Sequence, residues 1–130
     1  MTQPEPGTMG HRPYDIRAEQ VVLGAMMLSA DARDQIAEII KDPDDDYWRA
    51  GHRAIHRAIL RLRDGGGPTD AVAVRIELER RGELVGDLDA AYLLTLIERV
   101  PVAANGIWHA REIHKYGRTG QAQEEISRAW

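Results

Sequence analysis

The eight residues from 21 to 28, VVLGAMML, constrain the fold more than any other part of the chain. Apolar side chains fill nearly every position, so a helix formed here has no face suited to water and must be buried by other elements. Gly24 stands in the middle, where glycine costs about 1 kcal/mol relative to alanine. We therefore expect a buried helix that a neighbouring helix crosses closely at Gly24.

The segments on either side of this run also predict helix ends and loops. Asp15 is a good N-cap for the buried helix, with Glu19 placed to support its first turn. After Ser29 a second, shorter amphipathic helix is predicted from the apolar residues Ile36, Ile39 and Ile40. The next segment, KDPDDDYW at 41–48, is predicted to be a loop, because Pro43 interrupts a helix.

Two further helices are predicted between residues 49 and 82. The third helix runs to about Arg63 and carries one apolar stripe, formed by Ile55, Ile59 and Leu62. The glycine-rich turn DGGGPTD ends it, and Asp70 caps a fourth helix that ends near Gly82. That fourth helix has two apolar lines, one formed by Val72 and Ile76 and the other by Val74 and Leu78.

The last two predicted helices are separated by Pro101. Asp87 or Asp89 caps the fifth helix, whose apolar stripe consists of Leu93, Leu96, Ile97 and Val100. Asn105 is predicted to cap the sixth helix, which runs to about Tyr116. The short run VAV at 72–74 lies inside a helical period, so no strand is expected. The fold class is thus all-α, a compact bundle of about six helices.

The length of 130 residues fits one domain. Residues 1–13 hold three prolines and two glycines, which predicts a flexible N-terminal arm. Residues 14–116 form the predicted helical domain, and 117–130 a C-terminal tail. The absence of cysteine excludes a disulfide framework. No apolar run reaches the roughly 18 residues of a membrane span, so a soluble, cytoplasmic protein is expected.

No motif for ATP hydrolysis is present. The run GGGP at 65–68 is rich in glycine, but a P-loop needs G-x-x-x-x-G-K-[ST] between a strand and a helix. The two lysines, Lys41 and Lys115, do not follow a glycine. We expect no enzyme activity, no catalytic residue and no cofactor.

The histidines offer weak metal-binding patterns. His52 and His56 are four residues apart, which places them on one helix face, but a zinc site needs further ligands and no cysteine or H-E-x-x-H partner exists. His109 and His114 fall on different faces. Structural or solvent-exposed histidines are the expectation, and no metal site is predicted.

A row of arginines has two interpretations. Arg49, Arg53, Arg57 and Arg61 recur every four residues on the third predicted helix and would form a basic ridge, which can follow DNA phosphates. Alternatively, the ridge pairs with nearby acids such as Asp45, Asp46 and Asp64. The net charge of −4 argues against a globally basic nucleic-acid binder but not against a local basic patch, and no stacking aromatic residues accompany the ridge. A small DNA-binding protein that uses this ridge is therefore the alternative function.

Five short motifs follow one another in order. They are AEQVVLGAMML at 18–28, a pattern of Asp46, Tyr47, Trp48, His52 and Ile55, a turn of Pro68 and Asp70 followed by LERRGEL at 78–84, the group Tyr92, Leu93 and Leu96, and the set Pro101, Ala104 and Asn105. In this order and spacing, residues 13–113 resemble the N-terminal domain of DnaB-type replicative DNA helicases. The chain departs from the family pattern at the aromatic residues Tyr47 and Trp48, at His56, and at Asp89 with the two alanines that follow it. These departures indicate a diverged member or a stand-alone relative.

The resemblance implies a docking module of DNA replication rather than a motor. In the family this domain contributes to the hexamer collar, associates with its own copies and receives primase or the helicase loader. The family continues into a helical hairpin, of which residues 117–130 would be the start. The expected partner surface is the helix of Tyr92 and the following turn, represented by Tyr92, Leu96, Pro101 and Asn105.

Overall fold

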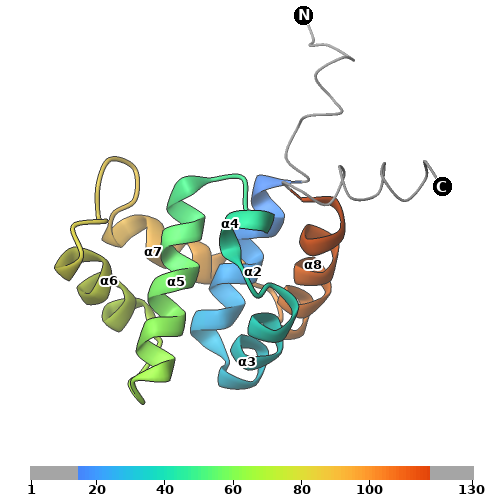
Figure 1. Cartoon of the computed structure of the whole chain (residues 1–130), viewed down its shortest axis with the longest axis horizontal. Coiled ribbons are helices and arrows are strands. Elements are labelled where there is room, and N and C mark those ends of the chain that lie inside the picture. The colour runs from blue at the N-terminus through green and yellow to red at the C-terminus, as the bar shows by residue number, and fades with distance from the viewer. Residues whose placement is uncertain (1–14, 118–130) are drawn as a thin grey trace, which may run out of the picture.

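A computed structural model describes residues 15–117, which form seven helices and no strand (Figure 1). The helices are α2 (Ile16–Leu28), α3 (Ala30–Ile39), α4 (Pro43–Asp46), α5 (Ala50–Asp64), α6 (Ala71–Arg80), α7 (Ala90–Glu98) and α8 (Ala103–Tyr116). The all-α class predicted from the sequence is confirmed. The predicted arm at 1–13 and all but the first residue of the tail at 117–130 lie outside the described residues. No helix among the described residues is long and apolar enough to cross a membrane.

Helix α2 lies at the centre and is covered by its neighbours (Figure 1). It contacts α3, α5, α7 and α8. Nine of its thirteen residues are buried, and they extend around the helix from Ala18 to Met27. The prediction of a helix buried on nearly all sides is therefore confirmed.

Glycine permits two close helix crossings on α2. A Cβ placed on Gly24 would overlap the carbonyl oxygen of Leu96 in α7 and would lie 2.5 Å from Cγ2 of Val100. On α8, a Cβ placed on Gly106 would overlap the Cβ of Ala25. The close crossing predicted at Gly24 is confirmed, and the sequence did not predict the second crossing, at Gly106.

Side-chain caps set the start of most helices. The side chains of Asp15, Ser29, Asp70 and Asp89 accept backbone N–H bonds at the starts of α2, α3, α6 and α7. Of the two candidates for the cap of the fifth predicted helix, the structure selects Asp89.

Two predicted helix boundaries are wrong. Residues 43–46 form the one-turn helix α4 rather than a loop, because Pro43 occupies the first helical position, where its fixed φ is favourable, and Asp42 caps the turn. Asn105 does not cap α8, because the helix already begins at Ala103, and Val102 at the cap position offers no side-chain bond.

The remaining helices pack around α2 at its two sides. Helix α6 packs against α5 and α7 at one end of the molecule, and α8 packs against α2 and α3 at the other (Figure 1). Of the two apolar lines on α6, Val74 and Leu78 are buried, whereas Val72 and Ile76 are 62% and 43% exposed. Only one of the two lines therefore contributes to the core.

Substitution of Gly24 by alanine tests the close crossing of α2 and α7. The new methyl group has no space beside Leu96 and Val100, so Gly24→Ala should lower the free energy of unfolding by about 1–3 kcal/mol despite the better helix propensity of alanine. Urea unfolding followed by circular dichroism measures the change.

The matched control is Gly51→Ala in α5, where a Cβ would make only ordinary contact, 3.7 Å from Cδ2 of Leu88. Its stability should stay equal or rise slightly. Equal stability of the two variants would contradict the close crossing.

Candidate functional site

A buried carboxylate, that of Glu19, connects α2 to the start of α5. Glu19 is only 1% exposed. Its Oε2 accepts the backbone N–H of Trp48 at 2.7 Å, and its Oε1 lies 2.7 Å from Nδ1 of His52. Glu19 does lie in the first turn of α2, as expected, but its carboxylate forms hydrogen bonds with Trp48 and His52, which lie about 30 residues further along the chain. A buried carboxylate is tolerated here because both oxygens have donors.

His52 passes this connection on to α7. The other ring nitrogen of His52, Nε2, forms a hydrogen bond with the hydroxyl of Tyr92, at an N–O distance of 2.6 Å. The amide Nε2 of Gln20 donates to the same hydroxyl oxygen at 3.1 Å. The His52 and Tyr92 rings are stacked, with centroids 5.9 Å apart. We refer to Glu19, Gln20, His52 and Tyr92 as the polar network, and it joins α2, α5 and α7.

A second buried pair lies beside the polar network. The hydroxyl of Tyr47 lies 2.8 Å from Nδ1 of His56, and neither residue is exposed. Burial lowers the pKa of His56 to about 3, and burial raises the pKa of Tyr47 well above its usual value. Both side chains are therefore neutral around pH 7, and the Tyr47 hydroxyl donates to the histidine. His52 and His56 thus both hold core hydrogen bonds between parts of the fold.

The structure brings together no metal-binding group in the described part of the chain. Within residues 15–117, no three histidine, cysteine, aspartate or glutamate side chains are placed to hold one ion. Asp46 and His114 form a pair at 3.0 Å, and burial raises the pKa of the Asp46 carboxyl although His114 opposes this shift.

The arginine ridge is engaged within the protein. Arg53 donates to the carbonyl oxygens of Tyr47 and Trp48, at 2.9 and 2.8 Å. Arg57 pairs with Asp44, Arg61 pairs with Glu77 and Glu83, and Arg49 lies over the ring of Tyr92. The acids are not the ones named from the sequence, but the interpretation as a ridge that pairs with local groups is favoured over a free track for phosphates.

The four residues expected to bind a partner have different environments. Leu96 is fully buried against Gly24, so its prediction as a surface residue is wrong: the apolar stripe of α7 faces the core. Tyr92 is half-buried and bonded to His52, whereas Pro101 and Asn105 are exposed. The partner surface predicted from the sequence did not include two exposed apolar residues beside them, Val102 at 57% and Trp108 at 54% exposure. A tryptophan on the polar side of a helical period is the signal that could have indicated Trp108.

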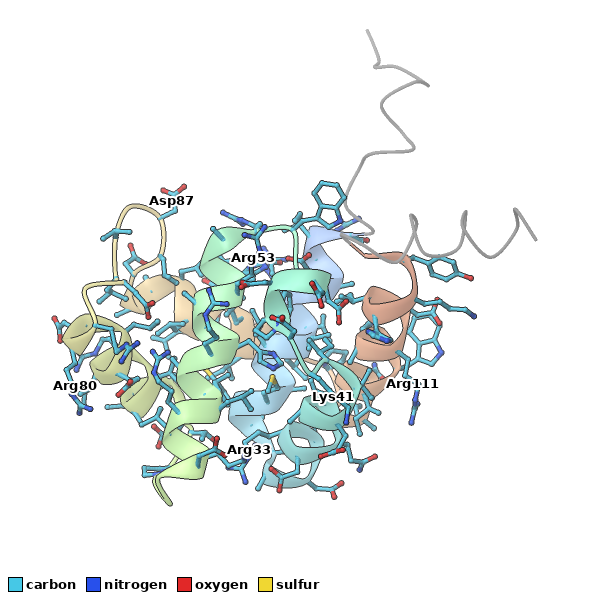
Figure 2. The ribbon with its side chains drawn as sticks, in the orientation of Figure 1. Arg33, Lys41, Arg53, Arg80, Asp87 and Arg111 are labelled. Carbon is cyan, nitrogen blue, oxygen red and sulfur yellow. The ribbon has the colours of Figure 1, made fainter. Side chains whose placement is uncertain are left out.

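A cavity of about 490 Å³ opens between α5 and the chain that leads to α7. Its walls include the first turn of α5, residues 82–88, and the rings of His52 and Tyr92. Two members of the polar network, His52 and Tyr92, thus line a surface cavity that was not predicted from the sequence. Figure 2 shows Arg53 near the top of α5 and Asp87 at the tip of the loop that borders the cavity.

Comparison with known proteins gives consistent matches. Residues 11–115 match the family model of the DnaB-like helicase N terminal domain. The replicative DNA helicases DnaB of Mycobacterium leprae and Leifsonia xyli are 46% and 41% identical over 98 residues, or 75% of this chain. That of Geobacillus stearothermophilus is 39% identical over 103 residues. The matched segments cover 16%, 21% and 22% of those proteins, so the chain spans about a fifth of their length.

A solved structure matches over most of both chains. The crystal structure of the N-terminal domain of DnaB helicase from Mycobacterium tuberculosis superimposes with a TM-score of 0.75 at 40% sequence identity. The match covers 89% of this chain and 84% of that one.

The buried His56 predicts a specific pH dependence of stability. In the unfolded chain a histidine binds its proton near pH 6.5, whereas folded His56 binds it only near pH 3. Between these values the unfolded state holds one more proton, so stability is lost as the pH falls, by up to about 1.4 kcal/mol per pH unit. Replacing His56 with phenylalanine removes this titrating group, so the slope should fall by the contribution of about one bound proton.

Urea unfolding at a series of pH values from 4 to 7 measures the slope. Ile59→Val, a mild core change on the same helix, is the control and should keep the wild-type slope although it lowers stability. An unchanged slope in His56→Phe would show that His56 does not remain neutral in the folded protein.

Proposed function

The chain belongs to the family of DnaB-like helicase N-terminal domains, and from this premise we propose that it is a non-catalytic protein-interaction domain of a replicative DNA helicase. In this role it contributes to a collar of self-associated copies and docks primase or a helicase loader. The match to the N-terminal domain of the M. tuberculosis DnaB helicase, over most of both chains, carries the proposal.

The chemistry of the chain supports a docking role. The sequence contains no P-loop motif. Among residues 15–117, the buried His52 and His56 are bonded to Glu19, Tyr92 and Tyr47, all within the protein. ATP hydrolysis and translocation are accordingly assigned to another part of the helicase.

The exposed side chains around the start of α8 make the best partner surface. Pro101 and Asn105 are exposed, and Val102 and Trp108 add exposed apolar area next to them. Tryptophan is enriched among the residues that dominate binding energy at protein interfaces. We call Pro101, Val102, Asn105 and Trp108 the α8 surface, and it replaces the buried Leu96 as the anchor.

Calorimetric titration tests both the role and the surface. The chain should bind at least one of the cognate primase, loader and full-length helicase with a Kd of tens of micromolar or tighter. Trp108→Ala should weaken that binding by about tenfold or more, because truncating a central aromatic anchor costs about 2 kcal/mol. Light scattering over a concentration series measures self-association in the same samples.

The matched control is Val72→Ala, which removes an apolar side chain of similar exposure from α6 at the far end of the molecule. It should bind as tightly as the wild type. No binding to any of the three proteins would contradict the proposed role. Binding that is unaffected by Trp108→Ala would show that the contact does not involve the α8 surface.

A further inference from the structure

The cavity beside α5 has one apolar wall. Leu88, Ala54 and Val85 line it, and Val85 is 66% exposed. Gly82 and Gly86, with φ of +70° and +59°, turn the chain so that residues 82–88 fold back over α5. An apolar side chain of a partner can therefore replace water against Leu88, Ala54 and Val85.

The lining of the cavity also includes a cation, Arg49, without a carboxylate partner among residues 15–117. Arg49 is exposed, and within residues 15–117 its guanidinium forms no ion pair but lies over Tyr92, with its carbon 5.6 Å from the ring centroid and Nη1 3.4 Å from the hydroxyl. Two other charged groups of the wall are already paired, Arg57 with Asp44 and Glu83 with Arg61. Arg49 is thus the cation of this wall whose hydrogen-bond donors are available to a ligand.

Tyr92 holds Arg49 at the rim. The polar network fixes the tyrosine hydroxyl through His52 and Gln20, so the ring offers a rigid face to the guanidinium. A cation over an aromatic face keeps its N–H groups at the ring's edge free for planar pairing with a carboxylate. The arginine is therefore positioned before any partner arrives, which lowers the entropy cost of binding.

We propose that this cavity is a docking site for an acidic peptide segment of a partner protein, in which a glutamate neighbours an apolar residue. The apolar side chain lies against Leu88 and Val85, and the carboxylate pairs with Arg49. The inference rests on the proposed function as a docking domain and adds the chemistry of one partner contact. It concerns a surface separate from the α8 surface.

Asp87 sets the orientation of the peptide. It also borders the cavity, and Figure 2 shows it at the outer tip of the loop. A carboxylate is repelled at this end and attracted at the Arg49 end, so the acidic residue binds on the α5 side. Removing the charge of Asp87 should therefore strengthen binding, while removing the charge of Arg49 should weaken it.

Titration with blocked dipeptides, followed by the backbone amide resonances of the chain in NMR, tests the proposal without any helicase partner. N-acetyl-leucyl-glutamyl amide should shift the signals of Gly51 and Leu88 with saturation in the millimolar range. The glutamine analogue, with the same shape and no charge, should bind about three- to tenfold more weakly. The difference should shrink as salt is added.

Variants assign the charge effect to single residues. Arg49→Gln should remove the preference for glutamate over glutamine, and Asp87→Asn should increase affinity for the glutamyl peptide. Arg111→Gln is the matched control, because Arg111 projects from α8 at the far end of the molecule (Figure 2). Absence of saturable shifts, or equal affinity of the two peptides for the wild type, would overturn the proposal and leave the partner titrations unaffected.

Discussion

The burial of α2 on nearly all sides is the constraint on which the rest of the fold depends. Because α2 has no face for water, helices α3, α5, α7 and α8 must cover it. Two glycines, Gly24 and Gly106, allow α7 and α8 to approach it at backbone distance. This packing leaves the outer faces of α6 and α8 free, which places exposed apolar side chains such as Val72 and Trp108 at opposite ends of the molecule.

The polar network adds specificity to this apolar arrangement. Glu19, His52 and Tyr92 belong to three motifs far apart in the sequence, and the fold brings them into one chain of hydrogen bonds. Each group is buried or half-buried, so α2, α5 and α7 must keep their register for the bonds to form. The same bonds hold Tyr92 at the wall of the cavity, where it positions Arg49. Core structure and proposed docking chemistry are linked through this one tyrosine.

Local signals in the sequence were sufficient for most of the fold and for little of the candidate site. The buried run around Gly24 and the caps at Asp15, Asp70 and Asp89 depend on neighbouring residues, and these predictions are confirmed. Pro43 and Asn105 were misjudged because each can either start or flank a helix, as Pro43 does at the first position of α4. The role of Glu19 was missed because its partner His52 lies 33 residues away. Leu96 was misplaced because an apolar stripe alone does not tell which of its residues face the core.

A double-mutant cycle between Glu19 and Tyr92 tests the central claim, that the polar network acts as one unit, most directly. The free energy of unfolding is measured for Glu19→Gln, for Tyr92→Phe and for the double variant. The two residues do not bond each other but share His52, so a connected network predicts a coupling energy of about 1 kcal/mol. Glu98→Gln with Tyr92→Phe, the control pair with an exposed glutamate, should show none. A coupling energy of zero between Glu19 and Tyr92 would contradict the account.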